Sequence, residues 1–271
     1  MLISVGLFLS VGCGLNPPAP KPEDKLVAEG VYVEGQPAGG LSAEEAGKLL
    51  TNLAKAKDVP AVNAGFDPVT GGVIPERPGQ RLDVSATLSE LLAAPSGSSI
   101  TVVYQPFLPE ITRDALARAR RLSAYTTPIL DKSPGRLVNI RLTAKLVNNT
   151  LIAPGQEFSF NQVTGEPTEA RGFQSAIVFG DSGQKEQGLG GGMCQVSSTL
   201  YNAALAAELK VTERHPHSKP VTYVPPGKDA TTYTDKDLRF LNTTRWRLLI
   251  RAFVHDESSK MTVDLWALPD A

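Results

Sequence analysis

The segment that most restricts how this chain can fold is a glycine-rich run, Gly188–Gly192, followed directly by apolar residues at helical spacing. The apolar positions are Val196, Leu200, Ala203, Ala204 and Ala207. This pattern predicts a tight turn that leads into a buried helix of about four turns. Cys194 falls in the first turn of that helix. Helix dipoles and unpaired N–H groups stabilise a thiolate there, so we expect a cysteine pKa below its ordinary value of about 8.5.

The composition excludes several classes of protein. The 271 residues allow one large domain or two of ordinary size. With 27 basic and 28 acidic side chains the formal charge is -1, so we expect no nucleic-acid partner. Two cysteines and three histidines are too few for a disulfide framework, a zinc ribbon or an iron–sulfur centre. We therefore expect no metal and no cofactor, and the 21 prolines and 24 glycines indicate many turns and short strands.

Residues 1–25 predict export to the cell envelope. Met1–Val11 is apolar and uncharged but about half as long as a membrane-spanning helix requires. It is typical of the hydrophobic part of an export signal, although it lacks the usual basic start. Cys13 follows a small residue and precedes the proline-rich Asn16–Pro22, as at a lipoprotein cleavage site, so we expect a lipid on Cys13. An ordinary signal peptide with an incidental cysteine is the alternative.

The rest of the chain predicts an α+β protein of two domains. Residues 26–106 are predicted to form a small domain, with helices that begin after Ser42, in a capping box, and after Asp83. Residues 107–135 are predicted to be a proline-punctuated connector with one short basic helix. Its basic residues are Arg113, Arg118, Arg120 and Arg121. The arginine-bearing face of that helix is either solvated or a docking surface for an anionic wall polymer. Residues 136–271 are predicted to form mixed strands around the cysteine-bearing helix.

Downstream of that helix, the chain offers partners for the cysteine in the order Cys, His, Asp. Two strands are predicted there, Val221–Val224 and Lys228–Tyr233. Cysteine hydrolases of the papain and transglutaminase type use this order, with the histidine and aspartate on adjacent strands. We therefore predict that Cys194 is a nucleophile, His217 its base and Asp229 the group that orients the imidazole. His215 is the reserve base.

The glycines suggest where a substrate would lie. They let a substrate backbone approach without a Cβ clash, and the N–H groups of Met193 and Cys194 are candidate donors to an oxyanion. The residues that we expect to contact the substrate are Gly190, Gly191, Gly192, Met193, Gln195, Ser197, Arg214 and Tyr223.

Three other interpretations of this region are weaker. A phosphate-binding loop needs a Lys-Ser/Thr pair after the last glycine, where Met193 and Cys194 stand. A zinc site of Cys194, His215 and His217 is conceivable, but the short spacing of the two histidines suits one tetrahedral ion poorly. A cysteine beside alanine and valine is often only a buried side chain.

Four motifs of the second domain resemble the VanW family, which is named for an accessory protein of bacterial glycopeptide-resistance clusters. They are Pro154–Asn161, Gly190–Asn202, Glu213–Ser218 and Gly227–Ala230. The family usually has a glycine where Glu208 stands, a departure that we expect to affect only the end of the helix. Phe66, Val73–Glu76 and Gly79–Asp83 resemble a peptidoglycan-binding domain that precedes several bacterial cell-wall proteins. Neither resemblance implies a reaction.

Two functions remain open at this point. The first is a cysteine-dependent hydrolase or acyltransferase whose partner is peptidoglycan or its stem peptides. The second is a non-catalytic peptidoglycan-binding or scaffold protein linked to glycopeptide resistance, in which Cys194 is a packed residue. Membrane contact is expected only through the N-terminal lipid. Alkylation distinguishes the two, because an accessible cysteine of low pKa reacts fast near neutral pH.

Overall fold

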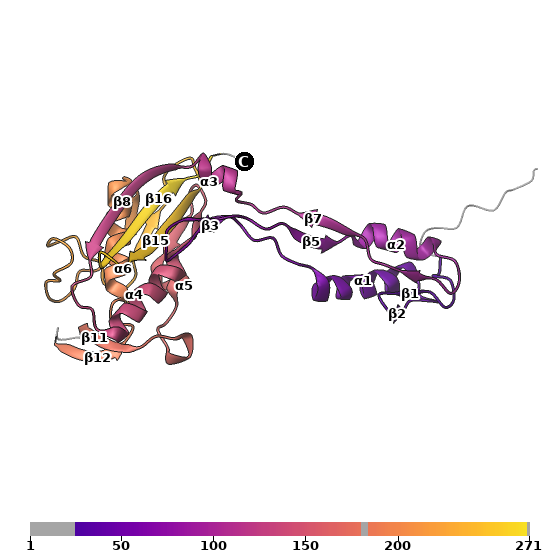
Figure 1. The fold of residues 1–271 in the computed structure, drawn as a ribbon, viewed down its shortest axis with the longest axis horizontal. Helices are drawn as coiled ribbons and strands as arrows, with labels where there is room; N and C mark the ends of the chain where they lie inside the picture. The colour runs from indigo at the N-terminus through magenta and orange to yellow at the C-terminus, as the bar shows by residue number, and fades with distance from the viewer. Residues whose placement is uncertain (1–24, 180–183, 270–271) are drawn as a thin grey trace, which may run out of the picture. The chain divides into compact units, whose positions relative to one another are not determined.

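The computed structural model describes residues 25–179 and 184–269, which form two compact units (Figure 1). Unit 1 consists of the residues up to Ala61 together with Pro78–Leu108. Unit 2 consists of Val62–Arg77 together with the chain from Pro109 onward. The predicted export segment, including Cys13, lies outside the described residues. Within them, no helix is both long enough and apolar enough to cross a bilayer.

Unit 1 is built from two helices and short strands around a small aliphatic core. Its elements are α1 (Ala43–Lys57), α2 (Val84–Ala93), β1 (Tyr32–Val33), β2 (Gln36–Pro37), β5 (Gly79–Leu82), β6 (Ser99–Ile100) and β7 (Tyr104–Phe107). The strands pair in the orders β2-β1-β6 and β5-β7. The Ser42 hydroxyl caps α1 in a capping box with Glu45, and the Asp83 carboxylate caps α2, so both predicted helix starts are confirmed.

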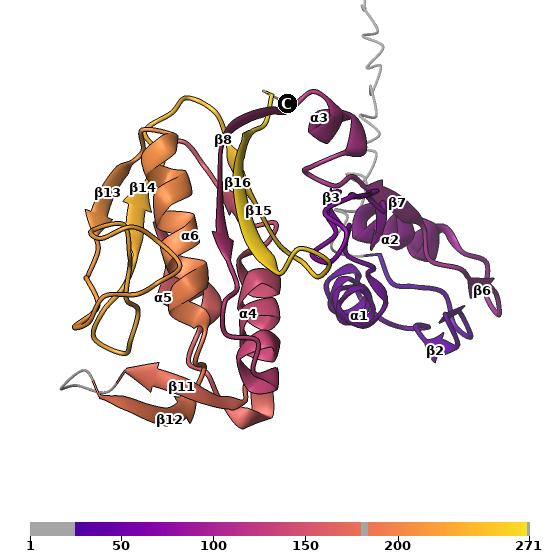
Figure 2. The same ribbon diagram turned by 60° about the vertical axis from the view of Figure 1, so that its left-hand side comes forward.

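Unit 2 centres on a four-stranded antiparallel sheet in the order β8-β16-β15-β9. The strands are β8 (Arg120–Pro128), β9 (Leu151–Ile152), β15 (Leu248–His255) and β16 (Lys260–Ala267). Helices α4 (Pro134–Val147) and α6 (Met193–Ala206) lie together on one side of this sheet (Figure 2). Their apolar faces meet the sheet in one core that includes Ile140, Val196, Leu200 and Val263. The predicted cysteine-bearing helix and the C-terminal hairpin are both confirmed.

A second small sheet and a hairpin complete unit 2. The sheet has the order β10 (Glu157–Ser159), β14 (Arg239–Leu241), β13 (Lys210–Glu213). The hairpin consists of β11 (Ser175–Phe179) and β12 (Lys185–Leu189). The remaining elements are β3 (Gly65–Phe66), β4 (Val73–Ile74), α3 (Arg113–Ala117), α5 (Phe160–Thr164) and the 3-10 turn η2 (Glu169–Arg171). The fold class is therefore α+β, as predicted.

The segment expected to be a connector contains a central strand. The basic helix ends at Ala117, and Arg120 and Arg121 begin β8, which pairs along its length with β16. The expectation of four arginines on one helix is wrong. The strand was hidden in the sequence because two of its buried positions carry Ser123 and Thr127, whose hydroxyls bond to α6. A strand whose buried face is polar lacks the alternation by which strands are recognised.

The hairpin β3-β4 lies in unit 2, although the sequence analysis placed it inside residues 26–106. Phe66 packs on Trp266, with 5.5 Å between the ring centroids, and its N–H donates to Asn149 Oδ1 at 2.7 Å. The aromatic contact and the hydrogen bond to Asn149 attach this short hairpin to the side of the four-stranded sheet that faces away from the helices.

At the end of α6, Glu208 occupies the position where the family usually has a glycine. Glu208 takes a φ of 56°, the left-handed conformation that glycine adopts most easily. The Leu209 N–H still closes the helix by donating to Ala204 O at 3.0 Å. The departure from the family pattern is thus absorbed in the helix cap.

Candidate active site

The glycine-rich turn delivers Cys194 to the first turn of α6, as predicted. Gly192 is the N-terminal cap of this helix, with a φ of 117°, and no side chain caps the helix. A Cβ at Gly192 would come within 2.9 Å of Ile140 Cγ1, and one at Gly191 within 2.6 Å of Ile177 O. Larger residues would therefore push the turn off its neighbours, and the thiol with it.

Cys194 is a partly buried residue whose sulfur lies near a backbone carbonyl and is influenced by a histidine. Its sulfur lies 3.7 Å from Thr232 O, and His217 is the side chain that acts most strongly on the thiol. Burial raises the pKa of Cys194, but the hydrogen bond and charge of His217, with bonds from Thr232, outweigh burial and hold that pKa below its usual value. This is the environment that favours a thiolate.

His217 is held on its other side by a carboxylate. Its Nδ1 lies 2.7 Å from Asp229 Oδ2, and its side chain is only 6% exposed. Burial lowers the pKa of His217, whereas hydrogen bonds and negative charge from Cys194 and Asp229 raise it, and the net direction is upward. Asp229 therefore fixes the ring through Nδ1, and both Cys194 and Asp229 act on the charge of His217.

Asp229 is fixed by an arginine that the sequence analysis assigned to substrate contact. Arg214 donates from Nε to the Asp229 carbonyl at 2.6 Å and from Nη2 to Oδ1 at 2.8 Å. Its guanidinium also lies over the Tyr201 ring, 5.6 Å from the centroid. Although burial raises the pKa of Asp229, the bonds from His217 outweigh it and lower that pKa. Arg214 therefore positions the carboxylate through Nε and Nη2.

Serines of α6 hold the loop that carries Asp229. The Ser198 hydroxyl accepts from the Ala230 N–H at 2.9 Å and donates to Cys194 O at 2.7 Å, while Ser197 donates to Ala230 O at 2.6 Å. These bonds replace sheet pairing, so the strands expected at 221–224 and 228–233 do not form. Only single bridges occur there, between His215 and Thr231 and between Tyr233 and Lys236. The signal that the sequence offered was the Ser-Ser pair one turn after the cysteine.

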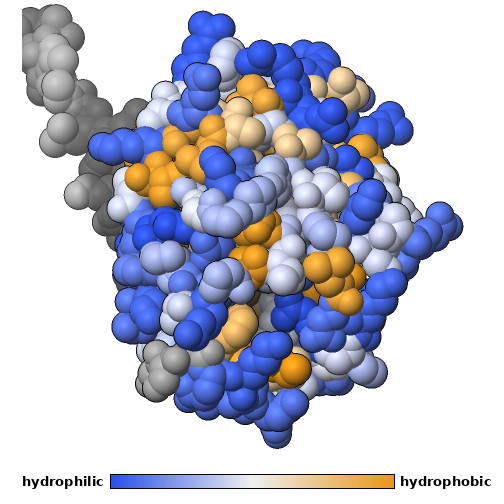
Figure 3. All heavy atoms as spheres, turned by 90° about the vertical axis from the view of Figure 1, so that its left-hand side faces the viewer, coloured by the Kyte–Doolittle hydropathy of each residue, from blue (hydrophilic) through white to orange (hydrophobic). Residues whose placement is uncertain are grey.

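Aromatic rings enclose His217. Phe179 and Tyr223 both meet its ring edge-on, with centroid separations of 6.3 and 6.5 Å. Phe179 belongs to the hairpin β11-β12, which also exposes Ile177 and Leu189. On the face of the molecule seen in Figure 3, hydrophobic side chains occur in separate small groups among hydrophilic ones. Burial and the nearby charge of Cys194 raise the pKa of Tyr223, so its hydroxyl stays protonated at neutral pH.

The other expected site residues have different partners. His215 is turned toward Glu213, with Nε2 3.0 Å from Oε1, and not toward the thiol. Gln195 is buried and donates to Thr127 Oγ1 and Pro128 O, so its amide is part of the interior. The Met193 N–H donates to Gly190 O at 3.0 Å, whereas the Cys194 N–H has no partner among the described residues and remains a candidate donor to an oxyanion. Ser197, as above, binds the loop.

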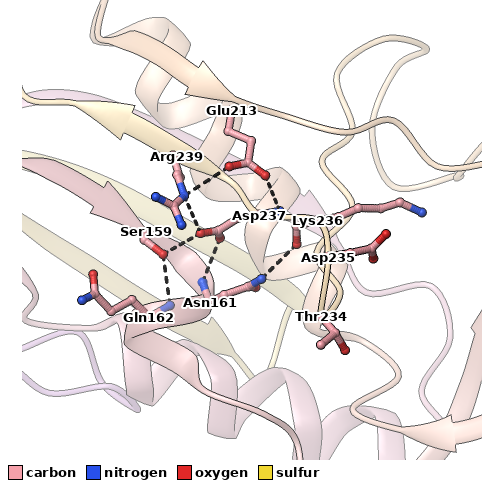
Figure 4. Close-up of a pocket in the computed structure, with 9 residues that line it drawn as sticks. All are labelled: Ser159, Asn161, Gln162, Glu213, Thr234, Asp235, Lys236, Asp237 and Arg239. Atoms are coloured by element: carbon pink, nitrogen blue, oxygen red, sulfur yellow. Dashed lines mark hydrogen bonds and ion pairs between the residues drawn. The ribbon is translucent and has the colours of Figure 1, made fainter.

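A separate pocket of about 510 Å³ lies beside the same loop (Figure 4). Its lining residues are Ser159, Asn161, Gln162, Glu213, Thr234, Asp235, Lys236, Asp237 and Arg239. Arg239 Nε binds Glu213 and the buried Asp237, and Glu213 in turn binds His215. The network ties the Asp237 end of the loop 229–237 to β13 and β14. Among the described residues, no group of three or more His, Cys, Asp or Glu side chains is placed to hold a metal ion.

Comparison with known proteins divides the chain in two. Residues 135–266 match the family described as "VanW like protein", and residues 25–102 match the family described as "Putative peptidoglycan binding domain". The uncharacterized protein YoaR of Bacillus subtilis is 38% identical over 188 residues, which cover 67% of this chain and 62% of YoaR. The vancomycin B-type resistance protein VanW of Enterococcus faecalis is 30% identical over 82 residues, 30% of each chain. The chain thus spans less than two thirds of either relative's length, and no solved structure matches it.

Proposed function

Since the chain belongs to the VanW family and carries a peptidoglycan-binding domain at its amino-terminal end, we propose that it is a cysteine-dependent hydrolase or acyltransferase acting on the peptides of peptidoglycan. Both family resemblances drawn from the motifs are confirmed. The observation that carries the proposal is the chain of contacts from Cys194 through His217 to Asp229. A cysteine nucleophile is activated by its position at a helix N-terminus and by a neighbouring imidazole whose pKa is raised.

In the first half of the reaction, the Cys194 thiolate attacks the carbonyl carbon of an amide. The C–S bond forms and the carbonyl π electrons move to oxygen, where the Cys194 N–H donates to the oxyanion. The His217 imidazolium then gives its proton to the amide nitrogen, the C–N bond breaks, and an amine leaves. A thioester on Cys194 remains. Asp229 holds the ring and stabilises its charge throughout.

In the second half, His217 acts as the base. It takes a proton from water or from an acceptor amine, whose oxygen or nitrogen attacks the thioester carbon. Collapse of the tetrahedral intermediate returns the electron pair to sulfur and frees Cys194. Water yields a carboxylic acid, which is hydrolysis, and an amine yields a new amide, which is acyl transfer.

The proposal includes a place in the cell envelope. The amino-terminal family match supports attachment to peptidoglycan and a position outside the cytoplasm. A lipid on Cys13, suggested by the apolar run and proline-rich spacer, would tether the protein to the membrane. Mass spectrometry of the membrane fraction tests the tether: an unmodified Cys13 there contradicts it.

The test of the enzyme uses the full chain and purified peptidoglycan fragments. We expect new peptide products by mass spectrometry with the wild type and none with Cys194→Ser, whose side chain is nearly isosteric. His217→Ala should lose the products as well, whereas His215→Ala should keep them, because His215 is bound to Glu213.

The pH dependence of Cys194 alkylation provides a second readout. The wild type should react well below pH 8.5, and His217→Ala should titrate near the free-thiol value of about 8.5. If the two proteins titrate alike near 8.5, the enzyme proposal fails.

A non-catalytic role is the second candidate. The observation that favours it is the 30% identity to a vancomycin B-type resistance protein, together with the peptidoglycan-binding match. In that case Cys194→Ser would bind sedimented peptidoglycan and support growth in a glycopeptide as well as the wild type does. An active enzyme should instead lose any growth phenotype with this substitution.

A further inference from the structure

Arg136 is a cation near the site that forms no ion pair with a carboxylate of residues 25–179 and 184–269. It lies in the first turn of α4, and its side chain crosses the glycine-rich turn: a Cβ on Gly192 would come within 3.2 Å of Arg136 Cγ. Its Nη2 donates to Gln195 Oε1 at 3.0 Å, so the guanidinium lies beside the residue that follows Cys194. Burial raises the pKa of Tyr223, and the charge of Arg136 acts on it in the opposite sense, as expected for close neighbours.

The guanidinium is held in place by neutral groups. Gln195 is itself fixed, because its amide nitrogen donates to Thr127 Oγ1 at 3.1 Å and to Pro128 O at 2.9 Å. Because the Arg136 side chain is already held, it loses little conformational entropy when a ligand binds to it. Arg136 Nε is buried and has no partner among the described residues, and Nη1 is neither buried nor bonded to any of them.

Asp131 is an acid whose pKa is affected by the charge of Arg136, but the two side chains form no ion pair. Asp131 accepts the Ser133 N–H at 2.9 Å, and this bond is the main reason that its pKa is lowered, with smaller effects from Arg136 and Lys185. No ion pair within 4.0 Å joins it to Arg136 in the described part of the chain. Arginine is suited to bind a carboxylate through two parallel bonds, and this one lies beside the residue that follows the nucleophile.

The surroundings reinforce the preference for an anion. Neither α4 nor α6 has a side-chain cap at its N-terminus, and the two ends are joined by a bond from Asn139 Nδ2 to Gly191 O of 3.0 Å. The positive ends of two helix dipoles thus meet where Arg136 crosses Gly192.

We propose that Arg136 is the carboxylate-binding residue of this site, and that the substrate is a peptide with a free carboxylate close to the amide that Cys194 attacks. The inference rests on the proposed function for the reaction itself, but the binding of a carboxylate beside Cys194 is testable without turnover.

The test compares two alkylating reagents that differ by a carboxylate. Iodoacetate and iodoacetamide react with the same thiolate, so the ratio of their rates reports how the site treats a carboxylate and cancels changes in thiolate population. We expect Arg136→Gln to lower the iodoacetate-to-iodoacetamide ratio on the order of tenfold, as loss of one charge-assisted contact requires. Glutamine keeps the Cγ atom that packs on Gly192. Arg136→Lys should retain most of the ratio.

The matched control is Arg141→Gln, on the same helix, where the side chain is exposed and paired with Asp256. It should leave the ratio unchanged. A second measurement uses N-acetyl-alanyl-alanine and its carboxamide as protecting ligands against iodoacetamide. The acid should protect the wild type at lower concentration than the amide, and the two should be equal in Arg136→Gln.

An equal ratio in the wild type and Arg136→Gln would overturn the inference, and so would an equal loss in Arg141→Gln. These outcomes are separate from failure of the enzyme proposal, which shows as an unshifted Cys194 titration with iodoacetamide in the wild type. If Arg136→Gln does not fold, the protection by acid against amide in the wild type decides the matter, and equal protection by the two overturns the inference.

Discussion

His217 bonds twice to the same oxygen of Asp229: its backbone N–H donates to Oδ2 at 2.6 Å and its ring Nδ1 lies 2.7 Å from that atom. The carboxylate thereby fixes both the main chain and the ring of the histidine. Nε2 is left as the ring nitrogen that is free to meet the Cys194 thiol. A loop residue with no sheet partner is in this way held as firmly as a strand residue would be.

Asp229→Asn should destabilise the protein in a pH-dependent way. The folded-state pKa of Asp229 lies below its unfolded value of about 3.9, so the stabilisation is complete above that value and is lost as the pH falls through the folded pKa. The difference in unfolding free energy between wild type and variant should be largest near pH 7 and shrink toward pH 3. Urea denaturation across this range measures it. Asp256→Asn, at an exposed pair, should show a small difference throughout.

Arg214→Gln should lower the unfolding free energy by about 2 kcal/mol, because it removes two charge-assisted bonds to Asp229, one to the backbone carbonyl and one to the largely buried carboxylate. Thermal or urea denaturation at pH 7 gives the value. Arg141→Gln, at a pair in which both side chains are about half exposed, should cost less than about 1 kcal/mol. Equal losses in the two variants would mean that Arg214 contributes no more than a surface pair.

Ser198→Ala should both destabilise the protein and slow alkylation of Cys194. The hydroxyl joins the Cys194 carbonyl to the Ala230 N–H, so its loss leaves a buried donor unsatisfied at a cost of about 1–3 kcal/mol and loosens the loop that carries Asp229. Ser89→Ala is the matched control, since Ser89 makes the same bond to the carbonyl one turn earlier on an exposed face. An alkylation rate that is the same in Ser198→Ala and wild type would count against the positioning role.

Gly192→Ala should cost about 1–3 kcal/mol and disturb Cys194. The residue has a φ of 117°, and the new methyl group would meet Ile140 Cγ1 at 2.9 Å. Gly47→Ala lies inside α1 with open space around it, so the same change there should stabilise by about 0.4–1 kcal/mol. Denaturation of both variants gives the comparison, and a stabilised Gly192→Ala would contradict the turn geometry.

Local features were readable from the sequence alone. The capping box at Ser42, the Asp83 cap and the placement of Cys194 after a glycine turn each depend on residues a few positions apart. The choice of His217 over His215 was also reached there, from the position of His217 next to an expected strand. The structure brings His217 to the thiol, but on a loop and for a different reason: Glu213 engages His215.

Features that depend on contacts between residues far apart in the chain were decided only by tertiary structure. Strand β8 is stabilised by hydroxyl bonds to α6 about 70–80 positions away, so its own side chains do not show a strand pattern. Arg214 and Gln195 look like substrate contacts until their partners, Asp229 and Arg136, are placed beside them. The sequence by itself determined the starts of α1, α2 and α6 and the types of reactive group. Tertiary structure determined which polar side chains are already satisfied and which remain free, because a hydrogen bond depends on distance in space and not along the chain.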